Sequence, residues 1–274
     1  FDLDMVLERL PLATTMMGVP TFYTRLLGDD RFTGDLAAPL RLFISGSAPL
    51  LAETHVQFEQ RTGHRILERY GMTETNMNTS NPYDGERRAG TVGFALPGVE
   101  LKITDADTGA TLPQGEIGQI EVRGPNVFKG YWQMPEKTAA ELRDDGFFIT
   151  GDLGRIDDDG YVHIVGRNKD LIISGGYNIY PKEIELLLDA QPGVLESAVI
   201  GVPHPDFGET VLGIVVPVAG ETPDLVAIMA AVQHSLARFK HPRQLILMDA
   251  LPRNTMGKVQ KNILRDQHKD LFAT

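Results

Sequence analysis

The hydrophobic positions in residues 1–89 predict alternating helices and strands. Apolar residues recur at helical spacing in residues 3–10, a short apolar run covers 40–44, and a helical stretch follows over 50–63. A second short apolar run then leads to Tyr70. A strand, a turn of small residues, a helix and another strand are typical of a mostly parallel sheet. We therefore expect an α/β subdomain in this part of the chain.

The pattern changes in residues 90–168, where apolar and polar residues alternate as they do in strands. The alternation is clear in residues 101–103 and 117–122, between turns rich in glycine, proline and aspartate. Asp159 and Gly160 separate two further apolar segments, and this dipeptide favours a β-hairpin. These features predict a small antiparallel barrel or sandwich.

Residues 169–274 combine helical stripes with apolar strands and predict a separate α+β domain. Pro181 marks the first turn of one helix. A second helix is expected to have Thr222 as its N-cap and Pro223 in its first turn, with an apolar stripe that continues to Phe239. Three strands are expected to fit between the helices: residues 198–202, 211–218 and 244–248.

The composition is that of a globular protein and excludes several classes of function. The 274 residues suggest about two domains, and 42% hydrophobic and 23% charged residues are close to the globular average. The net charge of −11 and the lack of a basic run argue against a nucleic-acid or anionic-membrane partner. The absence of cysteine excludes disulfides, thiolate metal ligands and cysteine nucleophiles. Because no apolar run approaches the roughly 18 residues of a membrane span and no signal peptide is evident, we expect a cytoplasmic protein.

Two polar segments follow the predicted strands of the first part. Gly46, Ser47 and Ala48 are small residues whose backbone amides can approach a flat or anionic ligand closely, although an ordinary tight turn has the same sequence. Residues 70–74 place an aromatic ring, a hydroxyl and a carboxylate close together. Such a set can stack an adenine, hold a phosphate oxygen and ligate Mg²⁺ through Glu74, and the alternative is a polar loop without a ligand.

Two later segments offer charged groups for a nucleotide. The carboxylate of Asp152 suits the paired hydroxyls of a ribose, and the guanidinium of Arg167 suits a ribose or phosphate oxygen. A surface salt bridge is the alternative for both. Lys258 is a lone lysine on a loop before the last predicted helix, where its charge can neutralise a phosphate. Taken alone, a solvated lysine is the commoner situation.

Four motifs occur in the order and spacing found in the adenylate-forming enzymes, which include acyl-CoA synthetases, firefly luciferase and the adenylation domains of peptide synthetases. They are Tyr-Gly-Met-Thr-Glu at 70–74, Thr-Gly-Asp at 150–152, a long motif at 166–185 and Gly-Lys at 257–258. The resemblance covers essentially the whole chain. Within this family, residues 70–93 are most similar to bacterial malonyl-CoA synthetases.

The resemblance implies a fold of the mixed α/β and α+β class. Residues 1–89 would be the last part of a large α/β adenylation domain, residues 90–168 a small β-barrel-like subdomain, and residues 169–274 a mobile α+β domain that turns about Lys169. The family's phosphate loop is absent from the sequence and is expected upstream of Phe1. The chain is therefore expected to be the C-terminal portion of a larger enzyme.

The resemblance also implies roles for individual residues. Lys258 is expected to be the adenylation lysine, Thr73 to contact the α-phosphate, and Glu74 to bind Mg²⁺ as the metal ligand. Gly176 belongs to a segment that would line the path of the CoA pantetheine arm. The full set expected to bind ATP or CoA is Gly46, Ser47, Ala48, Tyr70, Gly71, Met72, Asp152, Arg167 and Gly176.

Met77 is expected to line the acyl pocket. A side chain three residues beyond Glu74 can reach the far end of the bound acid if the chain continues alongside it. Met72 is the alternative lining residue, and packing in the core is the alternative role for Met77.

The implied activity is an ATP-dependent ligation of malonate to CoA through an acyl-adenylate, with Mg²⁺ as cofactor. A synthetase for another short acid and an adenylation domain that loads a carrier protein are the alternatives among enzymes. A catalytically inactive binding or regulatory fragment is the alternative outside them. The exposed loop also makes Lys258 a target for a protein lysine acetyltransferase and deacetylase, because acetylation removes its charge.

Overall fold

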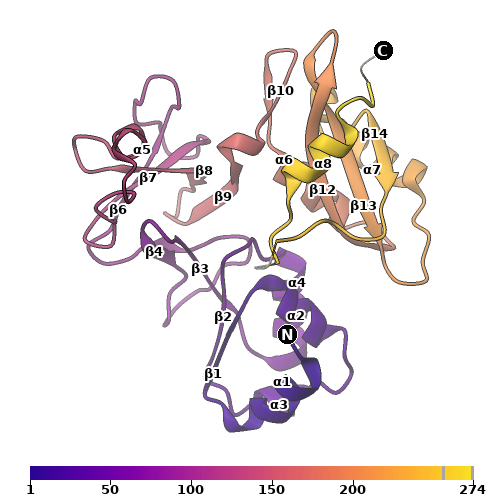
Figure 1. Ribbon diagram of the computed structural model, residues 1–274. Coiled ribbons are helices and arrows are strands. Elements are labelled where there is room, and N and C mark those ends of the chain that lie inside the picture. Colours follow the sequence, from indigo (N-terminus) through magenta and orange to yellow (C-terminus); the bar gives the residue numbers. More distant parts are fainter. Residues whose placement is uncertain (255–256, 273–274) are drawn as a thin grey trace. The chain divides into compact units, whose positions relative to one another are not determined.

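The computed structural model describes residues 1–254 and 257–272, and it divides into two compact units. The first unit comprises residues 1–164 and the second residues 165–274 (Figure 1). The mixed α/β and α+β class expected from the sequence is confirmed. The three-part division at residues 89 and 168 stays a prediction.

A five-stranded sheet forms the first half of unit 1, with strand order β1-β2-β3-β4-β5. The first three strands are parallel, as expected, and the last two are antiparallel. The strands are β1 (Thr15–Gly18), β2 (Leu42–Ser45), β3 (Leu67–Met72), β4 (Asn76–Ser80) and β5 (Phe94–Ala95). The helices drawn in indigo and purple in Figure 1 are α1 (Leu3–Arg9), α2 (Pro20–Leu27), α3 (Gly34–Ala37) and α4 (Ala52–Thr62), with a 3-10 turn at Leu10–Leu12.

Local signals explain where these helices begin and end. The side chain of Asp2 accepts a hydrogen bond from the Met5 amide at the start of α1. Gly63 ends α4 with φ of +74°, a left-handed conformation that glycine adopts readily. An aromatic cluster centred on Phe58 fills the core, where the ring of Phe43 from β2 meets it edge-on at 4.9 Å.

The second half of unit 1 is an antiparallel sheet with strand order β6-β7-β8-β9. Its strands are β6 (Glu100–Thr104), β7 (Gly118–Arg123), β8 (Phe148–Ile156) and β9 (Val162–Arg167), and α5 (Pro135–Glu141) precedes β8. Asp159 and Gly160 lie in the turn of the β8–β9 hairpin, as expected, and the Gly160 amide donates to the Asp157 carbonyl at 2.9 Å. The sheet is open along this path, so the expected barrel-like form is a four-stranded sheet that does not close.

Unit 2 is built around the long β12–β13 hairpin. Alternate residues of β12 point to opposite faces: Val199 belongs to a core cluster with residues of α6 and α7, and Ala198 and Ile200 belong to one with Leu264 of α8. The strands are β10 (Ile172–Ser174), β11 (Tyr177–Ile179), β12 (Val194–His204), β13 (Gly208–Pro217) and β14 (Gln244–Leu247). The helices are α6 (Pro181–Asp189), α7 (Leu225–Ser235) and α8 (Lys261–His268), with 3-10 turns at Asn168–Asp170 and Arg238–Lys240.

The limits of α7 differ from those expected. Its N-cap is Asp224 rather than Thr222, because the Asp224 carboxylate accepts hydrogen bonds from two amides of the first turn at 2.9 and 3.1 Å. The helix ends at Ser235, since the next residue is extended, and Phe239 lies in the following 3-10 turn. The apolar stripe predicted from the sequence therefore continues beyond the C-terminal end of α7 into the next 3-10 turn.

Among the described residues, no helix combines the length and the hydropathy needed to span a membrane.

Candidate active site

The turn after β2 contains the small residues 46–48, of which Ser47 is strained. Ser47 has φ of +70°, which a residue with a side chain rarely adopts. A Cβ atom at Gly46 would lie 2.8 Å from the Arg69 guanidinium, so glycine leaves room for the Arg69 side chain to lie against the turn. Glu68 of β3 accepts a hydrogen bond from the backbone two residues beyond the turn at 3.1 Å. The β3 side chains thus fix the turn from one side.

The tight connection between β3 and β4 carries Thr73 and Glu74. A Cβ atom at Gly71 would lie 1.9 Å from the Asn76 carbonyl oxygen, so only glycine fits there. Asn76 itself has φ of +52°, which asparagine tolerates better than most residues. Thr73 is exposed and Glu74 is half-buried. The hydroxyl and the carboxylate are therefore presented at the end of a rigid turn, with Met72 at the end of β3.

Two of the predicted segments meet in a buried hydrogen bond. The Tyr70 hydroxyl donates to Asp152 Oδ2 at 2.5 Å, although the residues are 82 positions apart. Tyr70 is 8% exposed and Asp152 is 4% exposed. The Thr150 hydroxyl accepts from the Asp152 amide at 3.1 Å and donates to a β7 carbonyl. A buried carboxylate oriented in this way has the chemistry needed for ribose hydroxyls.

The Glu74 carboxylate has a neighbour that the sequence did not identify. The Tyr131 hydroxyl lies 3.2 Å from Glu74 Oε1 and 2.6 Å from Glu141 Oε2, so it sits between two carboxylates. Burial, reinforced by these carboxylates, raises the pKa of Tyr131 above its usual range. Trp132, the next residue, is 87% exposed. The aromatic pair at 131–132 was a signal that could have pointed to this site.

The donor set around Glu74 fits Mg²⁺ that arrives with phosphate. Mg²⁺ commonly takes one or two protein carboxylates and completes its shell with waters and substrate phosphates. The described part of the chain holds no group of three or more His, Cys, Asp or Glu residues arranged as a metal site. The single Glu74 carboxylate with a neighbouring hydroxyl is therefore suited to a Mg²⁺ ion whose other ligands are waters and nucleotide phosphates.

Asn126 holds the strand that carries Met77. Its side-chain amide donates to the carbonyls of Thr75 and Met77 at 2.7 and 3.1 Å. Met77 is half-buried, and its terminal methyl would contact a Cβ atom placed on Gly71 at 2.9 Å. The Met77 side chain therefore lies over the backbone of the β3 end, next to the Glu74 turn.

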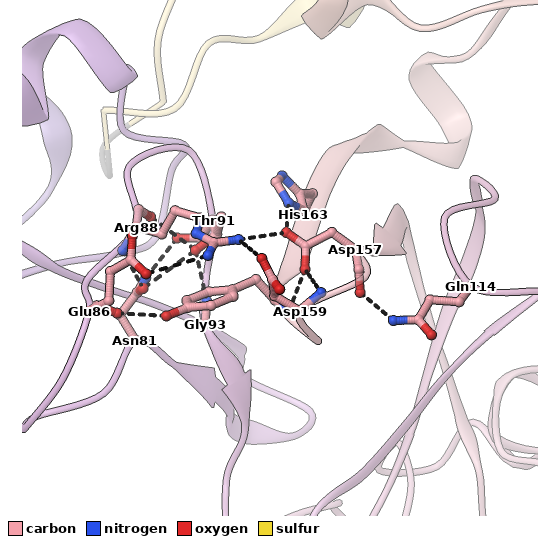
Figure 2. A network of polar contacts seen from close by, with 10 residues as sticks. Asn81, Glu86, Arg88, Thr91, Gly93, Gln114, Asp157, Asp159 and His163 are labelled. Carbon is pink, nitrogen blue, oxygen red and sulfur yellow. Dashed lines mark hydrogen bonds and ion pairs between the residues drawn. The ribbon is translucent and has the colours of Figure 1, made fainter.

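A polar network centred on Arg88 connects the loop after β4 to the β8–β9 hairpin (Figure 2). The Arg88 guanidinium pairs with Asp157 at 3.3 Å and with Asp159 at 2.9 Å, and it lies 4.1 Å from the Tyr161 ring centroid. His163 Nε2 contacts the same Asp157 oxygen as Arg88, at 2.9 Å. Burial disfavours the Asp157 carboxylate, but the hydrogen bonds that it accepts lower its pKa overall. Sequence reasoning missed this network, which fixes the two halves of unit 1 to each other.

The remaining predicted residues lie in unit 2. Gly176 has φ of +84° and Gly175 has φ of +56°, so they form the two-residue turn of the β10–β11 hairpin, where positive φ at both positions is required. Arg167 ends β9 and is exposed. Lys169 is exposed in the 3-10 turn, next to Asp170, which pairs with Arg265 of α8 at 2.7 Å.

Lys258 lies on a narrow loop before α8. Its amide donates to the side-chain oxygen of Asn254 at 3.0 Å, and its carbonyl accepts from the Asn254 amide at 3.0 Å. Lys258 is half-buried. Thr255 and Met256, which directly precede the Gly-Lys motif, lie outside the described residues.

Comparison with known proteins identifies the family. Residues 9–132 match the model of the AMP-binding enzyme family, and residues 183–258 match that of the AMP-binding enzyme C-terminal domain. A malonate–CoA ligase of Arabidopsis thaliana is 42% identical over 271 residues, which cover 92% of this chain and 44% of that protein. A probable CoA ligase of Humulus lupulus is 45% identical, with 92% of this chain and 44% of that protein covered.

Solved structures give the same result. ATP-bound MatB from Rhodopseudomonas palustris is 63% identical with a TM-score of 0.97, over 99% of this chain and 54% of that one. The amide bond synthetase McbA from Marinactinospora thermotolerans is 34% identical with a TM-score of 0.91, over 97% of this chain and 56% of that one. The chain spans about half the length of these relatives. The two family models and these matches confirm the expected resemblance, and the chain belongs to the AMP-binding, adenylate-forming enzyme family.

Proposed function

We propose that the enzyme to which this chain belongs is a cytoplasmic, ATP-dependent acid–CoA ligase that converts malonate, CoA and ATP to malonyl-CoA, AMP and pyrophosphate. The observation that carries the proposal is the 63% identity to ATP-bound MatB over nearly the whole chain. The malonate–CoA ligase of Arabidopsis thaliana supports malonate as the acid.

In the first step, a malonate carboxylate oxygen attacks the α-phosphorus of ATP, and the bond to pyrophosphate breaks. Asp152, held by Tyr70, would bind the ribose hydroxyls, and the turn at 46–48 would lie against the adenine. Thr73 would donate to the α-phosphate. Lys258 would stabilise the negative charge that builds up on the phosphate oxygens, a contribution typically worth 10²–10³ in rate.

Glu74 is the residue that would hold Mg²⁺, and the ion when bound would neutralise phosphate charge. Tyr131 would keep the Glu74 carboxylate in place, since its hydroxyl lies within hydrogen-bonding distance of that group.

In the second step, the CoA sulfur attacks the carbonyl of the malonyl-adenylate, the bond to AMP breaks, and the thiol proton is released to solvent. The thiol pKa near 8.5 leaves enough thiolate at neutral pH without a dedicated base. We assign Gly176 and its hairpin to the pantetheine path, Arg167 to a ribose or phosphate contact, and Lys169 to a hinge about which the C-terminal domain turns between the two steps.

The test is pyrophosphate release by the full-length enzyme with a panel of mono- and dicarboxylic acids. Malonate is expected to give the highest kcat/KM, and Lys258→Ala is expected to abolish pyrophosphate release while thioester formation from supplied malonyl-adenylate continues. A higher kcat/KM with another acid would reject malonate. No pyrophosphate release with any acid would reject the ligase itself.

Acetylation of Lys258 by a protein acetyltransferase would switch off the first step, because it removes the charge. Full activity of enzyme with quantitatively acetylated Lys258 would contradict this regulation.

A further inference from the structure

The loop that carries Lys258 is fixed at its base by its own backbone. Arg253 and Val259 form an antiparallel bridge, and the Gln260 amide donates to the Pro252 carbonyl at 2.8 Å. Within this bridge, Asn254 holds both the amide and the carbonyl of Lys258. The base of the loop therefore determines where the lysine backbone lies.

The Arg253 side chain connects this base to the central hairpin of unit 2. One guanidinium nitrogen donates to the carbonyl of Gly257, the residue directly before Lys258, at 2.6 Å. The other terminal nitrogen forms an ion pair with Glu196. A guanidinium can make both contacts at once because its donors point in fixed directions.

Glu196 anchors this arginine to the central hairpin of unit 2. It belongs to β12, where it pairs with Val216 of β13, and the two strands are hydrogen-bonded along most of their length. Burial raises the pKa of Glu196, while the Arg253 charge acts in the opposite direction. A half-buried carboxylate on a strand of this kind is held in place by the sheet and not by the loop.

We propose that Arg253 and Glu196 are positioning residues for Lys258: their ion pair holds the carbonyl before the lysine, and so keeps its ammonium group aligned with the phosphates during adenylation. The inference rests on the proposed function of Lys258. Because CoA does not need this lysine in the second step, loss of the ion pair should affect one half-reaction only.

The experiment measures both half-reactions in the full-length enzyme. Arg253→Ala is expected to lower kcat for pyrophosphate release about 10- to 100-fold, the range expected when hydrogen bonds to a charged group are lost, and to leave KM for ATP within about twofold. Thioester formation from supplied malonyl-adenylate is expected to stay at the wild-type rate. Glu196→Gln keeps the shape of the anchor without its charge and should lower the same kcat by a smaller factor.

Two further variants separate positioning from general damage. The exchange variant Glu196→Arg/Arg253→Glu restores the ion pair without the donor to the Gly257 carbonyl, and it is expected to remain impaired in adenylation with an unchanged melting temperature. Lys240→Ala removes another ion pair of unit 2, which Lys240 forms with Glu183 at 2.7 Å, and should leave pyrophosphate release unchanged.

Several outcomes would overturn the inference. They are an unchanged kcat for pyrophosphate release in Arg253→Ala and Glu196→Gln, or an equal fall of both half-reactions in Glu196→Gln. If Lys258→Ala abolishes pyrophosphate release and Arg253→Ala leaves it unchanged, the inference is rejected and the proposed function stands. Wild-type enzyme that releases no pyrophosphate with any acid would reject the proposed function instead.

Discussion

Replacing Asp189 by asparagine tests how a half-buried charge limits the stability of unit 2. Asp189 is the last residue of α6, and its Oδ1 accepts a hydrogen bond from the Ser197 hydroxyl of β12 at 2.6 Å. Burial raises the pKa of Asp189 from 3.8 to about 6. The Ser197 hydrogen bond and the Lys182 charge oppose this rise, and the carboxylates of Glu185 and Glu196 add to it.

The direction of the effect follows from the raised pKa. The folded state retains a proton that the unfolded chain releases between pH 4 and 6, so stability falls as the pH rises through this range. About two pKa units correspond to roughly 3 kcal/mol of lost stability by pH 7. Asparagine keeps the acceptor for Ser197 and carries no charge. The variant should therefore gain stability over wild type by roughly 2 kcal/mol between pH 4.5 and 7.5, and the gain should level off above that.

Hydrogen exchange of peptides from α6 and β12 in the full-length enzyme measures this change. The ratio of protection factors, Asp189→Asn over wild type, is expected to rise roughly 30-fold from pH 4.5 to 7.5. Asp249→Asn is the matched control, because it removes an exposed carboxylate that lies outside α6 and β12. A ratio for Asp189→Asn that stays constant over the whole range would refute the reasoning.

Four further substitutions test the proposed site. Lys169→Pro fixes φ near −65° in the proposed hinge, so adenylation should persist while most thioester formation is lost; parallel loss of both activities would reject the hinge. Met77→Ala should shift the ratio of kcat/KM values from malonate towards methylmalonate, and an unchanged ratio in a stable variant would support a packing role. Gly71→Ala should destabilise unit 1 by several kcal/mol and weaken ATP binding, because its Cβ would lie 1.9 Å from a backbone oxygen of β4; a wild-type melting curve would contradict this. Tyr131→Phe should raise the Mg²⁺ concentration for half-maximal activity and weaken Mg²⁺ binding in calorimetry about tenfold, and unchanged binding would show that the hydroxyl is dispensable.

Features set by a few neighbouring residues could be predicted from the sequence. The strand β2 follows from its apolar run, and the helix that ends at Gly63 and the hairpin at Asp159 and Gly160 have local causes in capping and turn chemistry. The start of α7 was misread because Thr222, Pro223 and Asp224 are adjacent and each can begin a helix. Only the structure shows which of the three accepts hydrogen bonds from the backbone amides of the first helical turn.

Contacts between distant residues could not be predicted in this way. Tyr70 and Asp152 were each expected at a nucleotide, but their hydrogen bond spans 82 positions and depends on how two sheets pack. The partners of Arg88 lie 69 and 71 positions further along the chain, and Tyr131 lies 57 positions from Glu74. Unless the three-dimensional arrangement of these segments is known, a lone arginine or tyrosine in the sequence cannot be distinguished from an ordinary surface residue.

The exposed indole of Trp132 gives this chain its own optical reporter. Trp132 is the only tryptophan in the 274 residues, so its fluorescence comes from one known position. An indole that is 87% exposed emits at the long wavelengths typical of contact with water. The indole lies next to Tyr131, whose hydroxyl contacts the Glu74 carboxylate. Any ligand or protein surface that covers the indole would move its emission to shorter wavelengths. Occupancy of this region can therefore be followed without a label or a chemical assay.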